Sequence, residues 1–355
     1  MSIIVLHDYF ESLEGGGRLS SLLAQHLGAS LGFGFARAAH PFLAHIAHTH
    51  SLNAFSRIPL WRQFKLSRAF AQRTDFLSNY HTVLYSGFYS PLAIQQHRIG
   101  RNILYCHTPP RFIYDQRDFY LQQLPRWQRP ALQAFIDYLQ PRYEVAVQAM
   151  DQIIANSKNV RDRIKNHLNQ SASVVYPPCE IEKYQWLGQG DYYLSTARLD
   201  PLKQVDKIVR AFLQLPDKKL IITSGGTELA RLRRLANHAA HIQFTGWIND
   251  TQLQQLIGKA IATIYVPQAE DFGMSPVESM AAGKPVIGLA EGGLLETIID
   301  QQTGLLLSAP LQVEELVNAV RSMNADYAQT MRTACEQQAQ RFSLSLFLEQ
   351  MQTIL

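Results

Sequence analysis

The sequence predicts an α/β protein built from two domains, each a doubly wound parallel sheet. Short apolar runs typical of buried strands alternate with amphipathic helical windows, and a Pro177-Pro178 break divides this alternation into two blocks. The length of 355 residues is enough for two hydrophobic cores of ordinary size. We therefore expect domains at 1–176 and 177–342, followed by a terminal helix at 343–355.

The expected strands follow from the apolar runs. In the first block they lie at 3–7, 82–86, 102–106, 152–155 and 174–176. In the second block the alternation is regular, with strands near 192–197, 219–223, 242–245, 261–266, 285–289 and 304–307. After Pro310 the pattern is helical to the end. Polar residues that directly follow these strands should gather at one edge of each sheet, where open α/β sheets bind ligands.

Composition argues against several classes of protein. Hydrophobic residues make up 46% of the chain, and no run of about 18 apolar residues could cross a membrane as a helix. The apolar segment 1–10 lacks a basic flank and a small-residue cleavage site, so it is interpreted as a buried strand rather than a signal peptide. Cys106, Cys179 and Cys335 are scattered without metal-ligand spacing, which is typical of reduced thiols in the cytoplasm.

The segment 270–278 is the most informative part of the chain. Glu270 and Glu278 stand eight positions apart across the start of a helix that is expected to open near Gly273 to Ser275, with Ser275-Pro276 predicted as N-cap and first helical residue. Glu270 should lie on the loop and Glu278 in the first turn. Free N–H groups and the helix dipole favour a phosphate there, and Gly273 lets a ligand come close. The alternative is that Ser275 and Glu278 form only a capping box, in which Glu278 satisfies a backbone N–H.

Other candidate ligand-binding residues also follow predicted strands. Arg198 and Lys203 lie five positions apart on one strand-to-helix loop, and such a pair can hold a diphosphate. Gly15 to Gly17 open the helix after the first strand and supply a second turn with bare N–H groups. His107 and the segment 245–247 end two further strands. A lone histidine at a strand end is more often structural.

Charge is distributed unevenly along the chain. Residues 1–175 carry a net charge of +8, and residues 176–355 carry −4. The segment 57–73 mixes basic and aromatic side chains, which suits a helix lying on anionic lipid; its expected anchors are Arg62, Lys65 and Arg68. Because Arg68 shares an arc with Trp61, an ordinary surface helix is the alternative. The aromatic-rich segment 112–127 is a second candidate for an acceptor side.

Taken in order, these motifs resemble those of the family 4 retaining glycosyltransferases, which have the GT-B fold. The resemblance covers nearly the whole chain and rests on Gly15–Gly17, His107-Thr108-Pro109, Asn156-Ser157, Arg198 with Lys203, Phe244-Thr245-Gly246, Glu270-x7-Glu278 and Gly292-Gly293-x-x-Glu296. It implies two Rossmann-like domains facing a cleft, with the last helix crossing back to the first domain. The string from His107 through Arg111 to Asp115 is similar to bacterial mannosyltransferases that build O-antigen or exopolysaccharide on a lipid carrier.

The resemblance also implies a role for each candidate. Arg198 and Lys203, with the N–H groups of the two predicted turns, would hold the diphosphate of a nucleotide-sugar donor. Glu278 would bind the ribose, Glu270 the sugar hydroxyls rather than acting as a nucleophile, and His107 would lie beside the transferred sugar. The remaining donor-binding residues are expected to be Gly16, Gly17, Thr245, Gly246, Trp247, Ile248, Phe272, Gly273, Met274 and Ser275. Arg111 is expected on the acceptor side.

The best donor hypothesis is GDP-mannose, and the expected acceptor is a glycan on a polyprenyl diphosphate at the inner face of the cytoplasmic membrane. A UDP-sugar donor or a soluble acceptor is the alternative, and a nucleotide-sugar epimerase is the alternative of another class. No Asp-x-Asp triplet occurs, so no metal or other cofactor is expected. The basic pI of 8.9 comes without a nucleic-acid-binding motif, so no nucleic-acid partner is expected.

Overall fold

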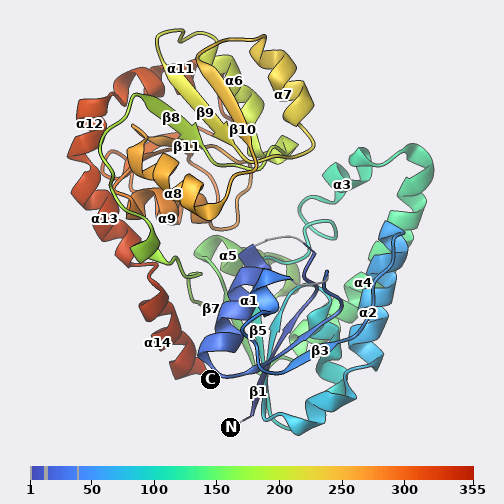
Figure 1. Cartoon of the computed structure of the whole chain (residues 1–355). Coiled ribbons are helices and arrows are strands. Elements are labelled where there is room, and N and C mark those ends of the chain that lie inside the picture. The colour runs from blue at the N-terminus through green and yellow to red at the C-terminus, as the bar shows by residue number, and fades with distance from the viewer. Residues whose placement is uncertain (1, 12–14, 38–39) are drawn as a thin grey trace. The chain divides into compact units, whose positions relative to one another are not determined.

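The structure, a computed structural model, describes residues 2–11, 15–37 and 40–355, and its chain divides into two compact units (Figure 1). Unit 1 comprises Met1–Tyr176 together with Leu348–Leu355, and unit 2 comprises Pro177–Phe347. Each unit is built around one parallel sheet with helices packed on it. This confirms the fold class that the sequence predicts.

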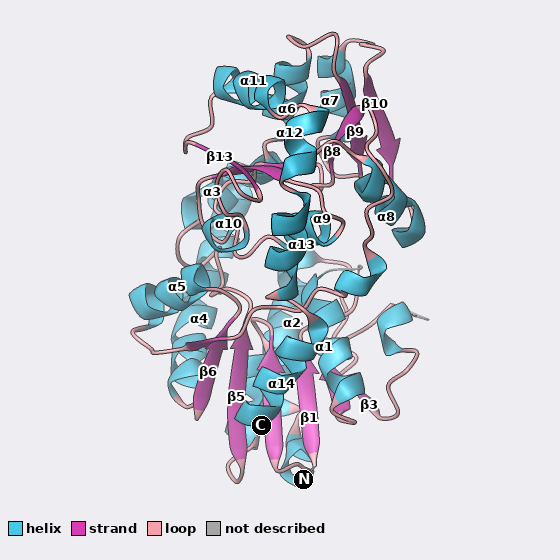
Figure 2. Cartoon of the chain, turned by 90° about the vertical axis from the view of Figure 1, so that its left-hand side faces the viewer, coloured by secondary structure: helices cyan, strands magenta, loops and turns pink. Residues whose placement is uncertain are grey.

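Unit 1 contains a seven-stranded sheet in the order β3-β2-β1-β4-β5-β6-β7. Its strands are β1 Ile3–His7, β2 Ser30–Phe33, β3 Thr49–Ser51, β4 Thr82–Ser86, β5 Arg101–Cys106, β6 Gln152–Ala155 and β7 Ser173–Val174. All neighbouring strands pair in parallel, and Figure 2 shows the arrows of β1, β5 and β6 pointing the same way. The order reverses between β1 and β4, which defines the topological switch point of this sheet.

The helices of unit 1 bury apolar faces against this sheet and against one another. They are α1 Gly15–His26, α2 Pro59–Gln72, α3 Arg117–Gln123, α4 Arg129–Gln148 and α5 Lys158–Leu168, with 3-10 turns at 41–43, 75–79, 90–96 and 126–128. Leu66 and Phe70 of α2 and Ile136 of α4 are fully buried in one cluster with Leu104 of β5. The same unit includes the end of α14, Leu344–Ile354, where the Arg101 guanidinium donates to the Leu355 carbonyl at 3.0 Å.

Unit 2 contains a six-stranded parallel sheet in the order β10-β9-β8-β11-β12-β13. Its strands are β8 Tyr192–Ser195, β9 Lys219–Thr223, β10 Ile242–Gly246, β11 Thr263–Tyr265, β12 Val286–Leu289 and β13 Gly304–Leu307. Its helices are α6 Val205–Phe212, α7 Leu229–Ala236, α8 Asp250–Lys259, α9 Met274–Ala281, α10 Leu294–Thr297, α11 Val313–Ser322, α12 Ala325–Thr330 and α13 Arg332–Gln340. The switch point of this sheet lies between β8 and β11.

Candidate functional site

The predicted site residues fall into two sets, one in each unit, and each set lies at the ends of strands. Unit 2 carries Arg198, Lys203, the segment 245–248 and the segment 270–278. Unit 1 carries Gly16, Gly17 and His107, together with the four basic residues proposed to meet an acceptor or a membrane.

An ion pair occupies the switch point of unit 2. Lys203 ends the 3-10 turn Pro201–Lys203 after β8, and Glu270 follows β11, so the two side chains come from the two strands at which the sheet order reverses. The Lys203 Nζ donates to Glu270 Oε2 at 2.7 Å and to the Tyr265 hydroxyl at 3.2 Å. Both charged side chains are about four-fifths buried, with 19% and 18% exposed.

The surroundings keep the Lys203 ammonium charged. Burial by itself lowers the pKa of Lys203, but Tyr265 and Glu270 outweigh it and raise that pKa above its usual range. Burial, together with the Glu270 charge, raises the pKa of Tyr265 as well, so this phenol stays neutral. The site therefore holds a fixed ammonium and a neutral hydroxyl beside a carboxylate, a set that can bind both an anionic group and sugar hydroxyls.

Arg198 lies on the same loop as Lys203 and is more exposed. Its Nε is 3.6 Å from Asp200 Oδ2, and 56% of its side chain is exposed. The loop is held in place from the neighbouring strand, because Gln204 Nε2 donates to the Val266 carbonyl at 3.0 Å and the Gln268 N–H donates to the Leu202 carbonyl at 2.8 Å. The backbone on which Arg198 and Lys203 lie is therefore anchored to the chain that follows β11.

Helix α9 starts within the predicted range of Gly273 to Ser275, but its N-cap differs from the predicted one. Its N-cap is Gly273, at φ +95°, and not Ser275, which is the second helical residue. The N-cap makes no side-chain hydrogen bond, and no acidic residue lies in the first turn, so the alternative of a Ser275–Glu278 capping box is wrong, as is the placement of Glu278 in that turn. A left-handed glycine makes this start possible, because other residues avoid that backbone conformation.

The N-terminus of α9 that follows Gly273 is still suited to bind an anion. The first N–H groups of a helix, here those of Met274 and Ser275, have no carbonyl to bond within the helix. Pro276 is the third helical residue, where its missing N–H costs no helical hydrogen bond. Backbone donors at Met274 and Ser275 therefore remain candidates for a phosphate.

The Gly292-Gly293 motif supports the loop that carries Glu270. The Gly293 N–H donates to the Glu270 carbonyl at 3.0 Å, and a Cβ at Gly293 would stand 2.3 Å from the Phe272 Cα. Glu291 accepts from the Ala269 N–H at 2.9 Å. Phe272 itself is buried and packs edge-on against Phe342, with the two ring centroids 5.3 Å apart, so its side chain belongs to the core. Glu291 is a supporting residue that the sequence analysis missed.

The proposed base-binding segment ends β10. The register with β9 shifts between Phe244 and Gly246, and Gly246 has φ +73°, so the chain turns sharply after the strand. Thr245 Oγ1 donates to the Gly246 carbonyl at 2.9 Å. Trp247 is 72% exposed, and Gly225 lies so close to its indole that a Cβ there would be 2.5 Å from Nε1. Ile248, the last of this set, is half-buried.

In unit 1, His107 belongs to a hydrogen-bonded network at the ends of three strands. His7 ends β1, Ser86 ends β4 and His107 follows β5. The Ser86 Oγ lies 2.8 Å from His107 Nε2 and 2.8 Å from Ser20 Oγ of α1, and His7 Nδ1 lies 2.8 Å from the Ser86 carbonyl. The glycine turn adjoins it, since a Cβ at Gly16 would lie 3.6 Å from His107 Nε2.

The environment makes both histidines neutral at pH 7. Burial lowers the pKa of His107 to about 4, and burial together with the neighbouring His107 lowers the pKa of His7 to about 3. Burial also raises the pKa of the adjacent Asp8 to about 6, although this carboxyl accepts from the N–H groups of Phe88, Tyr89 and Ser90. His7 and Asp8 directly follow or end a predicted strand, and that position was the signal the sequence analysis could have used.

The four basic residues predicted to face an acceptor or a membrane are partly engaged within unit 1. Arg62 pairs with Glu11 at 3.0 Å and is 19% exposed, and Arg111 pairs with Asp115 at 2.9 Å and is 12% exposed. Lys65 donates to the Phe55 carbonyl at 2.8 Å, and Arg68 donates to Gln72 at 3.1 Å. These contacts favour the alternative that α2 is an ordinary surface helix.

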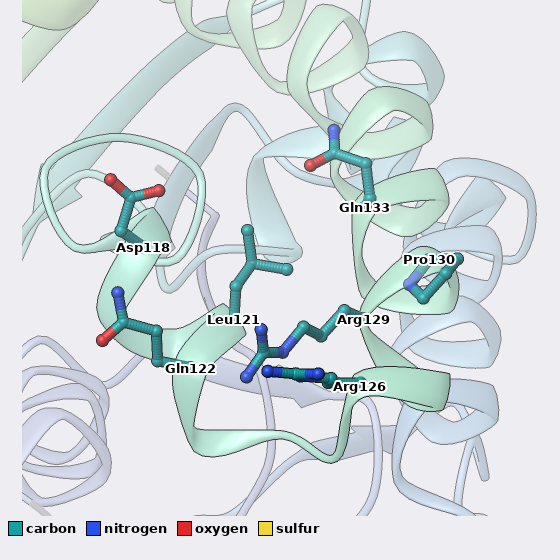
Figure 3. Close-up of a pocket in the computed structure, with 7 residues that line it drawn as sticks. All are labelled: Asp118, Leu121, Gln122, Arg126, Arg129, Pro130 and Gln133. Atoms are coloured by element: carbon teal, nitrogen blue, oxygen red, sulfur yellow. The ribbon is translucent and has the colours of Figure 1, made fainter.

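A more open basic and aromatic surface lies where α3 turns into α4. A hollow of about 420 Å³ is lined there by Asp118, Leu121, Gln122, Arg126, Arg129, Pro130 and Gln133 (Figure 3). Trp127, between the two arginines in the sequence, is 78% exposed. This surface is formed by part of the segment 112–127 and by the start of α4, so it overlaps the second region that the sequence predicts for the acceptor side.

The described residues contain neither a cluster of metal ligands nor a helix suited to span a membrane. Within 2–11, 15–37 and 40–355, no group of three or more histidine, cysteine, aspartate or glutamate side chains is arranged to hold a metal ion. In the same ranges no helix combines the length and the apolarity needed to cross a membrane.

The chain is similar in sequence and in fold to known glycosyltransferases. Residues 180–342 match the family of glycosyl transferases group 1. An alpha-1,3/1,6-mannosyltransferase of Dictyostelium discoideum is 24% identical over 303 residues, covering 71% of this chain and 69% of the relative. A GDP-Man:Man(3)GlcNAc(2)-PP-Dol alpha-1,2-mannosyltransferase of the same organism is 27% identical over 220 residues, covering 54% of this chain and 43% of the relative.

Among solved structures, sucrose-phosphate synthase from Thermosynechococcus elongatus superposes with a TM-score of 0.77 at 18% identity, covering 100% of this chain and 98% of that one. This likeness shows the GT-B fold. With this fold, the group 1 match of residues 180–342 and the mannosyltransferase relatives support a glycosyltransferase similar to family 4. The chain spans between 43% and 69% of the length of the two curated relatives described above.

Proposed function

We propose that the protein transfers mannose, with retention of configuration, from GDP-mannose to a glycan carried on a polyprenyl diphosphate. The observation that carries this proposal is the ion pair between Lys203 and Glu270 at the switch point of unit 2, in which Nζ and Oε2 are 2.7 Å apart. Glu270 precedes the N-terminus of α9, where backbone N–H groups lack helical partners. A cation and amides suit a diphosphate, and a carboxylate suits sugar hydroxyls. Mannose as the sugar is supported by the two relatives that are named mannosyltransferases.

The transfer breaks the bond between the sugar C1 and the donor phosphate oxygen. Negative charge then grows on the leaving diphosphate, and Arg198, Lys203 and the N–H groups of Met274 and Ser275 stabilise it more in the transition state than in the ground state. The acceptor hydroxyl forms the new bond to C1 on the same face, and its proton passes to the leaving phosphate. In unit 1, the N–H groups of Gly16 and Gly17 at the start of α1 form a further turn suited to an anion.

Glu270 positions the sugar in this scheme and does not attack it. Its carboxylate is already paired with the Lys203 ammonium at 2.7 Å, which lowers its reactivity as a nucleophile and leaves oxygen lone pairs for sugar hydroxyls. His107 is a weak base, with a pKa near 4, and therefore suits a hydrogen bond to a sugar hydroxyl better than proton removal. Glu278 is assigned to the ribose and the segment 245–248 to the base.

The proposed setting is bacterial surface polysaccharide synthesis at the inner face of the cytoplasmic membrane. Residues 1–175 carry a charge of +8, and the exposed Trp127 stands beside Arg126 and Arg129 at the turn before α4. Basic and aromatic side chains together favour an anionic lipid surface. The leaving group is held by protein cations, so we propose that the transfer needs no metal ion.

Thermal unfolding tests the donor assignment. A ligand that binds only the folded protein raises the melting temperature, by an amount that grows with its concentration relative to its Kd. We expect GDP to raise the melting temperature clearly more than UDP at equal concentration. An equal or larger shift with UDP would contradict GDP-mannose as the donor and favour the UDP-sugar alternative.

A further inference from the structure

The hydrogen bonds around His107 in unit 1 can be assigned a direction, because this series of hydrogen bonds ends on the Gly16 carbonyl oxygen. Ser20 Oγ lies 2.8 Å from the Gly16 carbonyl, which can only accept, so the single hydroxyl proton of Ser20 points to Gly16. Ser20 Oγ must therefore accept in its other contacts. One of these is with Ser86 Oγ at 2.8 Å. Ser86 thus donates its own proton to Ser20.

This order determines the proton on His107. Because the Ser86 proton is used on Ser20, the Ser86 Oγ can only accept from His107 Nε2, 2.8 Å away. His107 must then carry its proton on Nε2. Its low pKa, near 4, means that a second proton is absent at pH 7, so Nδ1 keeps its lone pair.

The same reasoning about donors and acceptors gives His7 the opposite tautomer. Its Nδ1 lies 2.8 Å from the Ser86 carbonyl, so Nδ1 carries the proton, and the same N–H reaches Ser20 Oγ at 3.0 Å. His7 therefore supports both serines without accepting either hydroxyl proton. Ser20 and Ser86 are fully buried, which shields these bonds from competing water.

We propose that Ser86 and Ser20 are positioning residues that hold His107 in the Nε2–H tautomer, so that His107 offers Nδ1 as a hydrogen-bond acceptor to a sugar hydroxyl of the donor. An acceptor nitrogen selects a hydroxyl and disfavours a phosphate oxygen, which has no proton to give at that position. The series of hydrogen bonds from His107 to the Gly16 carbonyl also fixes the position of the His107 ring relative to the glycine turn. The inference rests on the proposed role of His107 in glycosyl transfer.

Imidazole NMR tests the tautomer without any substrate. In protein labelled with ¹⁵N-histidine, two-bond ¹H–¹⁵N correlations distinguish Nε2–H from Nδ1–H, and the His107 signals are identified by their loss in His107→Gln. We expect Nε2–H for His107 in the wild type and a mixture of tautomers in Ser86→Ala. An Nδ1–H tautomer in the wild type would overturn the proposal, as would a Ser86→Ala spectrum identical to the wild type.

Kinetics test the consequence for transfer. Ser86→Ala and Ser20→Ala should each lower kcat about 10- to 100-fold, because the imidazole loses a hydrogen-bond partner that orients it. The donor KM should change less than about threefold, because the phosphate contacts remain. Unchanged kcat in both variants would overturn the proposal.

The matched control is Ser90→Ala. Ser90 is fully buried in the same unit, and within the described part of the chain its hydroxyl has no hydrogen-bond partner. This variant therefore removes one buried hydroxyl without touching the chain to His107, and kcat should stay near the wild-type value. A fall as large as that of Ser86→Ala would contradict the proposal. Absence of transfer by the wild type would reject the proposed function, while the NMR result would still decide the tautomer.

Discussion

Lys203 and Glu270 come from the two strands that flank the switch point of unit 2, and each neutralises the other at 2.7 Å. An ammonium that is four-fifths buried would be destabilised by desolvation if it lost this partner, and so would the carboxylate. The pair can therefore stay preorganised in the absence of a donor. When a diphosphate arrives, the ammonium has a second anion to stabilise, and the carboxylate can accept from sugar hydroxyls.

Replacing the two cations tests this assignment. Arg198→Ala and Lys203→Ala should each lower turnover by roughly 10²- to 10³-fold, because each removes charge that stabilises the leaving diphosphate. Steady-state rates of nucleotide release measure the effect, and circular dichroism checks folding. Arg233→Ala, which removes an exposed arginine of α7, is the control and should be near normal. Near-normal turnover in both test variants would remove the diphosphate assignment.

At the level of elements, apolar runs predicted most strands of both sheets, including the edge strands β10 and β13 of unit 2, but they missed two strands of unit 1. β1 and β6 have the predicted bounds, because fully buried parallel strands are continuous apolar runs. β2 and β3 were not predicted. β3, Thr49–Ser51, has three residues of sequence THS at the edge of the sheet, so it lacks the apolar run by which strands are recognised.

The site shows the same division between local and long-range information. Lys203 and Glu270 could be singled out because each follows an apolar run, but their pairing depends on the strand order. The N-cap of α9 was assigned to Ser275 because Ser275-Pro276 is a common N-cap signal, whereas the left-handed conformation of Gly273 depends on its loop. The bond between Ser20 and Ser86 joins residues 66 positions apart and leaves no local pattern.

The turn between α3 and α4 carries the prediction for membrane binding. Charge reversal by Arg126→Glu with Arg129→Glu should weaken binding to anionic vesicles, since each basic residue near such a surface contributes about 1 kcal/mol. Binding should also weaken as salt rises. Vesicle sedimentation measures both effects. Arg62 is not used for this test, because a glutamate at position 62 would face Glu11, the partner of Arg62, and would disturb the fold.

The control for that experiment is a charge-matched change in unit 2. Arg233→Glu with Arg234→Glu alters two exposed arginines of α7 by the same net charge. It should reduce vesicle binding much less than the change at 126 and 129. Equal partitioning to neutral and anionic vesicles, or equal loss in both double variants, would leave a soluble acceptor as the better interpretation.

Across the whole molecule, both sheets reverse their order beside their first strand, and in both the polar groups of the site gather at that place. Unit 2 has Lys203 and Glu270 there, and unit 1 has His7 and Ser86, with His107 one strand further on. Strand ends at a switch point leave room for side chains and ligands that a continuous sheet would not. The repeated topology thus explains why two separate blocks of sequence each carry site residues.

Burial of the histidines predicts how stability depends on pH. The pKa values of His7 and His107 fall from 6.5 to about 3 and about 4, so the unfolded chain binds more protons than the folded chain below pH 6.5. Their contribution is present above pH 6.5 and is lost as the pH falls toward 4. Asp8 acts in the opposite direction, because its pKa rises from 3.8 to about 6. Two histidines outweigh one carboxyl.

The unfolding free energy should therefore decrease between pH 6.5 and 4, by about 1.4 kcal/mol per pH unit for each net proton. Urea unfolding at several pH values measures this slope. In His7→Asn one of the two histidine contributions disappears, so its slope should be shallower than that of the wild type. The same slope in both proteins would show that His7 titrates alike in the folded and unfolded states.

The most direct test of the account is to incubate the protein with a panel of nucleotide sugars and a polyprenyl-diphosphate glycan, with and without excess EDTA. We predict GDP release from GDP-mannose, mannose with retained configuration on the lipid-linked product, and little change with EDTA. Release from none of the donors would contradict glycosyl transfer by these residues, and an epimerised sugar without transfer would assign the chain to another class. Complete loss in EDTA, restored by magnesium or manganese, would show that a metal ion rather than Arg198 and Lys203 stabilises the leaving diphosphate.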